Sequence, residues 1–215
     1  MNLIRSLWAL QPIRCRAMSV DVARIRAALG AVRVQSSDFD LNPPHVLQTG
    51  RARQPAAVLI GLWDRPGGAT VILTKRARHL LHHPGQIAFP GGKVDQSDAD
   101  HQACALREAF EEIGLPPSLV QIMGCLPAHE TVTGFQITPV LGHIRADFTP
   151  VMQSAEVEEV FTVPLQHVFN LANYRIERRL WRGGWRHFYA VPYGPYYIWG
   201  ATARILRGLA ERMAQ

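Results

Sequence analysis

Residues 106–114 read LREAFEEIG and combine a helical apolar period with three glutamates. Apolar residues recur at three- and four-residue intervals, which predicts a helix with one buried stripe formed by positions 103, 106, 109, 110 and 113. At about 100° per residue, Glu108, Glu111 and Glu112 are expected on the side opposite that stripe. The segment therefore predicts three carboxylates on one helix face.

Three like charges on one face destabilise a helix, so a compensating cation is expected beside them. Mg²⁺ and Mn²⁺ are the natural candidates, because these hard cations prefer carboxylate oxygens and bind beside substrate phosphates. The alternative is a solvated acidic face, which is the commoner explanation of a glutamate cluster. The preceding residues 89–92, FPGG, favour the metal, since adjacent glycines let the backbone approach a ligand closely.

The remaining chain mixes predicted strands with a few helices. The glutamate helix is expected to begin at Asp98 or Asp100 and to end at Gly114. Further helices are expected at residues 20–29 and 201–213, and strands at 56–63, 70–74, 119–126, 135–144, 160–163, 174–181 and 186–191, with 175–182 also compatible with a helix. Residues 64–68, DRPGG, predict a hairpin turn. The pattern indicates one layered α/β domain over residues 31–215, preceded by an extension and helix over residues 1–30.

Composition restricts the partners. The chain has 23 Lys and Arg against 17 Asp and Glu, and this net charge of +6 favours nucleic acid, an acidic lipid surface or a phosphorylated small molecule. No apolar run approaches the roughly 20 residues that span a bilayer, so no membrane partner is expected. Three cysteines without metal spacing fit a reducing compartment. A cytoplasmic location is expected; the acid-free, arginine-containing first 20 residues also fit an organellar transit peptide, although Met18 can equally be a start.

Residues 92–115 resemble the signature of the Nudix hydrolases, in which a glycine is followed by a glutamate, Arg-Glu, an aliphatic residue, Glu-Glu and Gly-aliphatic. The half from Arg107 to Leu115 matches closely. Upstream, one additional residue between Gly92 and Arg107 puts Ala99 at the position of the early glutamate, with an aspartate on either side. The resemblance implies an α/β/α sandwich with a mixed sheet and hydrolysis of a pyrophosphate bond that depends on Mg²⁺ or Mn²⁺.

The segment before this signature resembles the motif of the coenzyme A pyrophosphatase branch of Nudix hydrolases. The similar residues are LTKRA at 73–77, Gly85 and FPGG at 89–92, and further similarity to bacterial members lies at 132–140 and 197–203. Ala77 and Leu81 stand where the motif usually has Ser and Arg. The resemblance implies cleavage of coenzyme A or its thioesters into adenosine 3′,5′-bisphosphate and 4′-phosphopantetheine or its acyl form.

The resemblance also implies roles for the glutamate helix. Glu108 and Glu112 are the expected principal metal ligands, and Glu111 is a further ligand or a group that orients water. Gly92 is expected beside the metal. Arg107 is expected to orient the glutamates through salt bridges, because it shares their helix.

Other candidates lie outside the helix. Glu156 is the expected general base, with the neighbouring Glu158 and Glu159 as alternatives. Candidate substrate contacts are Lys75, Arg76, Phe89 and Gly91. Arg76 is favoured for the phosphates because a guanidinium suits them, whereas Lys75 is expected on the exposed surface.

Two rival functions stay open. One is a Nudix hydrolase of another nucleoside diphosphate derivative, such as ADP-ribose, a dinucleotide or a nucleoside triphosphate, which the differences at Ala77 and Leu81 allow. The other is a silent Nudix module that binds a nucleotide or RNA without cutting it. All three signature glutamates are present, so hydrolysis is favoured and no nucleic-acid partner is expected. A homodimer is an expectation at the level of the family.

Overall fold

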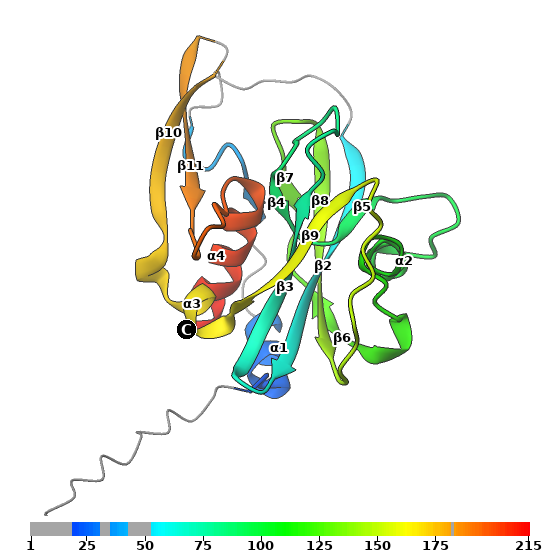
Figure 1. Ribbon diagram of the computed structural model, residues 1–215. Coiled ribbons are helices and arrows are strands. Elements are labelled where there is room, and N and C mark those ends of the chain that lie inside the picture. Colours follow the sequence, from blue (N-terminus) through cyan, green and yellow to red (C-terminus); the bar gives the residue numbers. More distant parts are fainter. Residues whose placement is uncertain (1–18, 31–34, 43–52, 182) are drawn as a thin grey trace, which may run out of the picture.

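The computed structural model describes residues 19–30, 35–42, 53–181 and 183–215 (Figure 1). The helices are α1 (Val22–Gly30), α2 (His101–Ile113), α3 (Leu165–Phe169) and α4 (Ala201–Met213), with 3₁₀ turns η2 (Pro117–Leu119) and η3 (Leu171–Asn173). The strands are β1 (Ser36–Ser37), β2 (Gln54–Arg65), β3 (Gly68–Arg76), β4 (Ile87–Ala88), β5 (Gly91–Lys93), β6 (Val120–Cys125), β7 (His129–Glu130), β8 (Phe135–Ile144), β9 (Val157–Pro164), β10 (Arg175–Trp181) and β11 (Gly184–Ala190). The expected transit peptide or alternative start lies outside the described residues.

A nine-stranded mixed sheet forms the centre of the molecule. Its main path is β1-β7-β8-β2-β3-β4, and β5, β6 and β9 pair with β2, β8 and β3. β2 is parallel to β8, from Gln54 opposite Phe135 to Trp63 opposite Ile144, and antiparallel to β3. This central position explains the nearly continuous apolar run of β2, because both of its faces are covered.

Helices cover the two faces of the sheet and create two apolar cores (Figure 1). Side chains of β2 alternate between them. Leu59 and Trp63 pack on the α2 side, whereas Ile60 and Leu62 pack on the side of α1, α3 and α4. Ile25 of α1 is 1% exposed and belongs to the second core. The three layers confirm the predicted α/β/α sandwich with a mixed sheet.

The predicted turns and strands are largely confirmed. Pro66 and Gly67 form the β2–β3 turn, and Gly68 opens β3 with a φ of 116°. The segment that was also compatible with a helix is strand β10, which pairs antiparallel with β11 in a separate hairpin. None of the helices within the described residues has the length and apolar character needed to cross a membrane.

Both ends of α2 form as the sequence predicts. The Asp100 carboxylate accepts a hydrogen bond of 2.8 Å from the Ala103 N–H and caps the helix. Gly114 ends it in the left-handed conformation, with a φ of 66°.

The predicted buried stripe of α2 was partly wrong. Phe110 is 54% exposed, and Leu106 is only half-buried. The face against the sheet consists of small residues and the last isoleucine, namely Cys104, Ala105, Ala109 and Ile113, and it also takes in Glu112. Small side chains let the helix lie close to β2, and this rotation carries Glu112 out of solvent rather than opposite the buried face.

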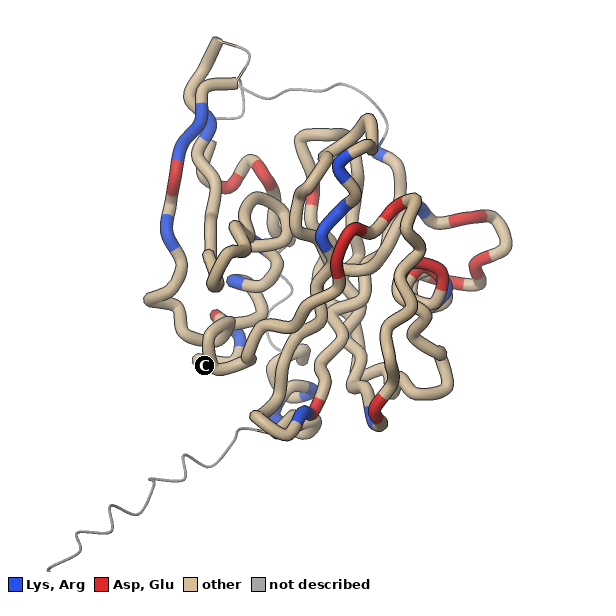
Figure 2. The backbone as a smooth tube through the Cα atoms, in the orientation of Figure 1, with Lys and Arg blue, Asp and Glu red and all other residues tan. Residues whose placement is uncertain are grey.

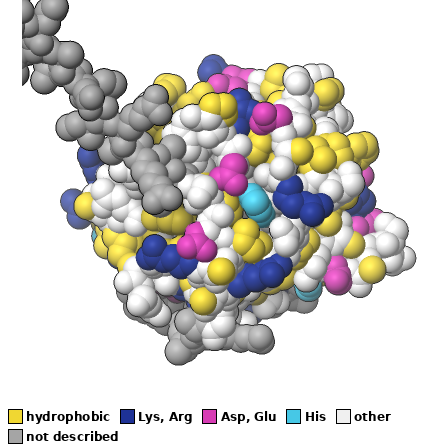
Figure 3. All heavy atoms as spheres, turned by 90° about the horizontal axis from the view of Figure 1, so that it is seen from below, with side chains coloured by type: hydrophobic (Ala, Val, Ile, Leu, Met, Phe, Trp, Pro, Cys, Tyr) yellow, Lys and Arg dark blue, Asp and Glu magenta, His cyan; other side chains and the backbone are white. Residues whose placement is uncertain are grey.

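Charged side chains are distributed over several faces. At the end of the molecule that carries α1 and the β2–β3 turn, basic and acidic side chains alternate with apolar ones (Figure 3). Along β3 and β9, a basic strand end lies beside an acidic one (Figure 2). The net positive charge is therefore mixed with acidic groups on both of these surfaces.

Candidate active site

Gly91 joins the glycine loop, residues 89–92, to the centre of the sheet. It pairs with Val58 of β2 and has a φ of 155°. A side-chain carbon here would lie 2.6 Å from the Val58 Cα, so only glycine allows the two strands to approach this closely. The Gly91 N–H donates a hydrogen bond of 3.3 Å to Oε2 of Glu112. The glycine loop thus holds a carboxylate of α2.

Gly92 makes room for a second carboxylate. A side-chain carbon at Gly92 would overlap with the carboxylate of Glu108. The Glu108 side chain is 16% exposed and therefore lies between α2 and β5 rather than in open solvent. The paired glycines and the helix consequently bring two glutamates to the same strand.

Glu112 is a buried carboxyl group with a strongly altered acidity. It is 5% exposed, and burial raises its pKa to about 8. The negative charges of Glu108 and Glu156 raise this pKa further, whereas the Gly91 N–H and the positive charge of Arg76 lower it. Burial likewise raises the pKa of Glu108, and Glu111 and Glu156 add to that increase. Arg76 of β3 and Glu156, directly before β9, thus act electrostatically on Glu112 of α2.

Arg107 is hydrogen-bonded to three acids. Its Nε and Nη2 each donate to Asp98 over 2.9 Å, and its Nη1 donates to Glu108 at 3.0 Å and Glu111 at 3.2 Å. Asp98 has a side chain only 3% exposed, and its hydrogen bonds from Arg107 hold its pKa well below the usual range. Arg107 thereby fixes the end of the loop before α2, which lies within the signature segment 92–115 (the box), to the acidic face of the helix.

The position of the early acid needs correction. Counting back from Arg107 selects Ala99, but the acid that bonds to Arg107 is Asp98. The additional residue lies between Asp98 and the helix, where the loop can absorb it. Counting forward from Gly92 selects Asp98 instead. The two aspartates have different roles, because Asp98 accepts hydrogen bonds from Arg107 and Asp100 caps α2.

The ends of β3 and β9 add basic and acidic groups to the same region (Figure 2). Nζ of Lys75 forms an ion pair of 2.7 Å with Glu158, and the Lys75 side chain is 21% exposed, so it is less exposed than predicted. The Arg76 Nε is buried and has no hydrogen-bond partner among the described residues. Glu156 directly precedes β9, and its carbonyl accepts a hydrogen bond of 2.8 Å from the Ala77 N–H.

Two of the predicted residues lie in contrasting environments. Phe89 is 4% exposed and belongs to the core beneath α4, which favours a packing role; its contact with substrate stays a prediction. Glu111 is the most exposed box glutamate, with 54% of its side chain accessible. Of the two positions that differ from the coenzyme A motif, Ala77 is buried, with 3% of its surface exposed, and Leu81 is 94% exposed.

The carboxylates do not form a complete protein cage for a metal. Within the described parts of the chain, no three His, Cys, Asp or Glu side chains gather closely enough to hold a metal ion. An arrangement of one or two carboxylates is nevertheless usual for Mg²⁺ sites in which waters and substrate phosphates fill the remaining positions. The oxygen donors of Glu108 and Glu112 are of the chemical type that such a cation prefers.

Comparisons with known proteins agree with this geometry. The family model described as the NUDIX domain matches residues 52–181, which span both the glycine loop and α2. The chain belongs to the Nudix family. A relative described as uncharacterized Nudix hydrolase NudL, from Enterobacter sp. (strain 638), is 44% identical over 184 residues, which cover 81% of this chain and 90% of that protein. The NudL of Escherichia coli (strain K12) is 42% identical over 174 residues, with the same coverage of 81% and 90%.

Solved structures support the Nudix fold. The Nudix domain of Shewanella oneidensis NrtR, in complex with ADP ribose, has a TM-score of 0.50 and 15% identity to this chain. That likeness covers 79% of this chain and 96% of the NrtR domain, so it extends beyond the box to most of the sandwich. Nudix hydrolases act on nucleoside diphosphate derivatives, which identifies the class of substrate.

Proposed function

We propose that this Nudix hydrolase cleaves the pyrophosphate bond of coenzyme A or its thioesters, giving adenosine 3′,5′-bisphosphate and 4′-phosphopantetheine or its acyl form. The chief support is the proximity of Arg76 to Glu112. Arg76 belongs to the LTKRA segment that resembles the coenzyme A motif, and its charge lowers the pKa of the box carboxyl. This effect supports a site in which a guanidinium suited to phosphate and the carboxylates of α2 act on the same substrate.

Glu108 and Glu112 would hold a Mg²⁺ or Mn²⁺ ion, with Glu111 as a further ligand or a group that orients water. Their burial and mutual repulsion, seen in the raised pKa of both groups, favour a cation that stabilises the ionised forms. Gly92 supports this arrangement because it leaves room for the Glu108 carboxylate. When bound, the cation supplies charge neutralisation for phosphate oxygens and increases the acidity of nearby water.

The remaining residues orient the reactants and move a proton. Arg107 positions Glu108 and Glu111 through its hydrogen bonds and is a positioning residue. Glu156 accepts a proton from the attacking water, a role supported by its electrostatic effect on both box glutamates. Arg76, whose buried Nε lacks a partner among the described residues, donates to a substrate phosphate. Lys75, the neighbour of Arg76 on β3, and Gly91 of the glycine loop are the further substrate contacts of the proposal.

Coenzyme A suits the site because it carries a pyrophosphate and a separate 3′-phosphate. The Lys75 ammonium and the Arg76 guanidinium, at the C-terminal end of β3, match this charge distribution better than they match an uncharged sugar. ADP-ribose, which lacks the 3′-phosphate, is the closest rival in chemistry. The difference between the two substrates therefore tests the substrate assignment.

Initial rates with coenzyme A, dephospho-coenzyme A and ADP-ribose, in Mg²⁺ and in Mn²⁺, test the proposal. We expect kcat/KM to be at least tenfold higher for coenzyme A than for ADP-ribose, and Arg76→Met to reduce that preference. A preference for ADP-ribose would transfer the enzyme to another Nudix substrate. Binding of these compounds without metal-dependent turnover would instead support a silent nucleotide-binding module.

A further inference from the structure

The general base of the proposed reaction, Glu156, is carried by a segment outside the helices and strands. Residues 145–156, the β8–β9 segment, join β8 to β9, and Glu156 is the last of them. The Glu156 side chain is exposed and forms no hydrogen bond or ion pair within the described residues. The position of its carboxylate therefore depends on the backbone that carries it.

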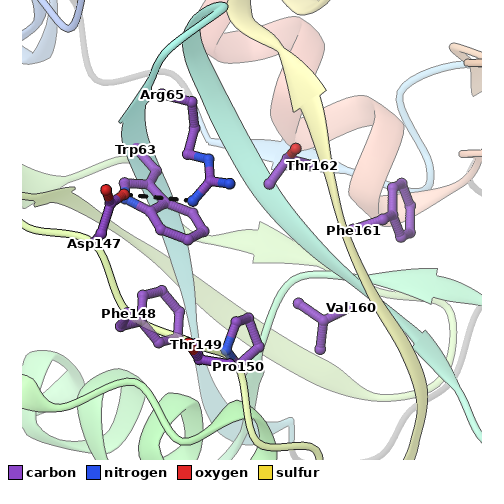
Figure 4. Close-up of a pocket in the computed structure, with 9 residues that line it drawn as sticks. All are labelled: Trp63, Arg65, Asp147, Phe148, Thr149, Pro150, Val160, Phe161 and Thr162. Atoms are coloured by element: carbon purple, nitrogen blue, oxygen red, sulfur yellow. Dashed lines mark hydrogen bonds and ion pairs between the residues drawn. The ribbon is translucent and has the colours of Figure 1, made fainter.

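The first half of the β8–β9 segment packs on the α2 side of the sheet. Phe148 lies beside Trp63, with ring centroids 4.8 Å apart, and it also belongs to the core beneath α2. Pro150 lines the same hollow as Phe148 and Val160 (Figure 4). Side-chain packing thus directs the segment from the sheet toward the end of α2.

The second half of the segment is hydrogen-bonded to the last turn of α2. The Val151 N–H donates to the Ile113 carbonyl, and the Gln153 N–H donates to the Glu112 carbonyl, both over 3.0 Å. Carbonyls at the end of a helix have no partner within that helix, so these bonds complete the helix as well as hold the segment. The segment that leads to Glu156 therefore starts from the backbone of Glu112.

A compact turn connects Gln153 to Glu156. The Gln153 carbonyl accepts hydrogen bonds from the N–H groups of Glu156 at 3.0 Å and Val157 at 2.9 Å. Its side-chain Oε1 accepts a further bond of 2.7 Å from the Ala155 N–H. With these three bonds closed on one residue, the turn can move only as a unit, and a contact with any part of it also fixes Glu156.

Two hydrogen bonds connect this turn to the loop that follows β3. The Ala77 N–H donates to the Glu156 carbonyl over 2.8 Å, and Nε2 of His79 lies 3.0 Å from the Ala155 carbonyl oxygen. A carbonyl can only accept, so the geometry assigns the proton of the neutral imidazole to Nε2. Of the two bonds, only that of His79 uses a side chain and can be removed by substitution.

We propose that His79 is a positioning residue for the hydrolysis, because its bond to Ala155 holds the turn that carries Glu156 in place relative to Glu112. The proposal rests on the proposed role of Glu156 as general base and applies to whichever nucleoside diphosphate derivative is the substrate. A general base must lie within hydrogen-bond reach of the water that it deprotonates. A displacement of about 1 Å can lower a rate by about 10²-fold, so even a modest shift of the turn affects kcat.

The test is a double-variant cycle in steady-state kinetics with His79→Ala, Glu156→Gln and the combined variant of the full chain. Coenzyme A and ADP-ribose are used in parallel with Mg²⁺, so a wrong substrate assignment does not affect the comparison. We expect His79→Ala alone to lower kcat about tenfold at nearly constant KM. In the Glu156→Gln background the same substitution is expected to lower kcat less than about twofold, because the group that His79 positions is already inactive.

Two matched variants identify the hydrogen bond as the cause. In His79→Gln the side-chain amide can donate to the same carbonyl, and kcat is expected to stay within about threefold of the wild type. His82→Ala removes an exposed histidine of the same loop, which has no hydrogen bond to another described residue, and is expected to leave kcat unchanged. His79→Gln as slow as His79→Ala would overturn the proposal.

Hydrogen exchange of the Ala77 amide, followed by NMR without substrate or metal, provides a readout that needs no turnover. We expect His79→Ala to speed this exchange at least about fivefold and His82→Ala to leave it unchanged, because the amide donates to the turn that His79 holds. Unchanged exchange in His79→Ala, or an equal loss of kcat with and without Glu156, would overturn the proposal. Faster exchange together with an unchanged kcat in Glu156→Gln would instead refute Glu156 as the base, and with it the catalytic role of His79.

Discussion

The Glu112→Gln variant distinguishes the effect of the buried Glu112 carboxyl on the free energy of unfolding from its effect on cation binding. The Glu112 pKa is raised from 4.5 to about 8, so between these pH values the folded metal-free protein keeps a proton that the unfolded chain releases. The free energy of unfolding of the wild type then falls by about 1.4 kcal/mol per pH unit, and the loss is complete above pH 8. The upper bound of this loss is about 5 kcal/mol. Glutamine has no such titration and nearly the same volume.

The assay is urea unfolding of both proteins in EDTA at several pH values between 5 and 9. We expect the variant to become progressively more stable than the wild type as the pH rises, by about 2 kcal/mol or more at pH 8.5. Glu111→Gln is the matched control, because this glutamate is 54% exposed and its loss is expected to change stability by less than about 1 kcal/mol.

Addition of Mg²⁺ or Mn²⁺ should reverse the order at high pH. Binding to the ionised site stabilises the wild type, and the Gln variant lacks the charge that binds the cation. If the wild type and Glu112→Gln have the same pH dependence of unfolding in EDTA, the inference that burial raises the pKa of Glu112 is refuted.

Three further changes test the neighbouring contacts. Gly92→Ala should displace the Glu108 carboxylate and lower kcat at least tenfold while thermal unfolding changes little; an active variant with unchanged Mn²⁺ affinity would contradict this. Asp98→Asn should lower the free energy of unfolding by about 2 kcal/mol, because it weakens a buried pair with Arg107; urea denaturation measures this, and a neutral effect would show the pair to be dispensable. Glu156→Gln should reduce kcat by about 10²- to 10⁴-fold with little change in KM, as expected for loss of a general base; an unchanged kcat in steady-state kinetics would point to another acid.

Local signals in the sequence were sufficient to predict the ends of α2, the β2–β3 turn and strand β2, but not short elements such as α3 and β4. Asp100 and Gly114 mark the ends of α2 because capping depends on residues within one turn of the helix end. The turn at Pro66 and Gly67 and the apolar run of β2 are equally local. Residues 175–181 could not be assigned from their own sequence, since their strand form depends on pairing with β11.

The orientation of α2 could not be predicted from periodicity. Phe110 and Glu112 are both on the helix, and hydrophobicity alone assigns the phenylalanine to the core. In the structure Phe110 is exposed and Glu112 is buried. The small residues Cys104 and Ala109 let the helix lie close to the sheet, and the Gly91 N–H donates to the Glu112 carboxylate. A charged residue buried against the pattern is the kind of local conflict that occurs at functional sites.

Spacing arithmetic likewise could not choose between Ala99 and Asp98. The additional residue of the box can be absorbed on either side of the early acid, and only the hydrogen bonds of Arg107 decide. The proximity of Arg76 and Glu156 to α2 also required the fold, because β3, β9 and the helix are far apart along the chain.

Identification of the products formed from coenzyme A tests the central claim most directly. Purified protein is incubated with coenzyme A and Mg²⁺ or Mn²⁺, with Glu112→Gln in parallel, and the products are separated and identified by mass. Adenosine 3′,5′-bisphosphate and 4′-phosphopantetheine in equal amounts, formed by the wild type and not by the variant, are the predicted result. Intact coenzyme A under conditions in which ADP-ribose or another nucleoside diphosphate derivative is hydrolysed would contradict the substrate assignment.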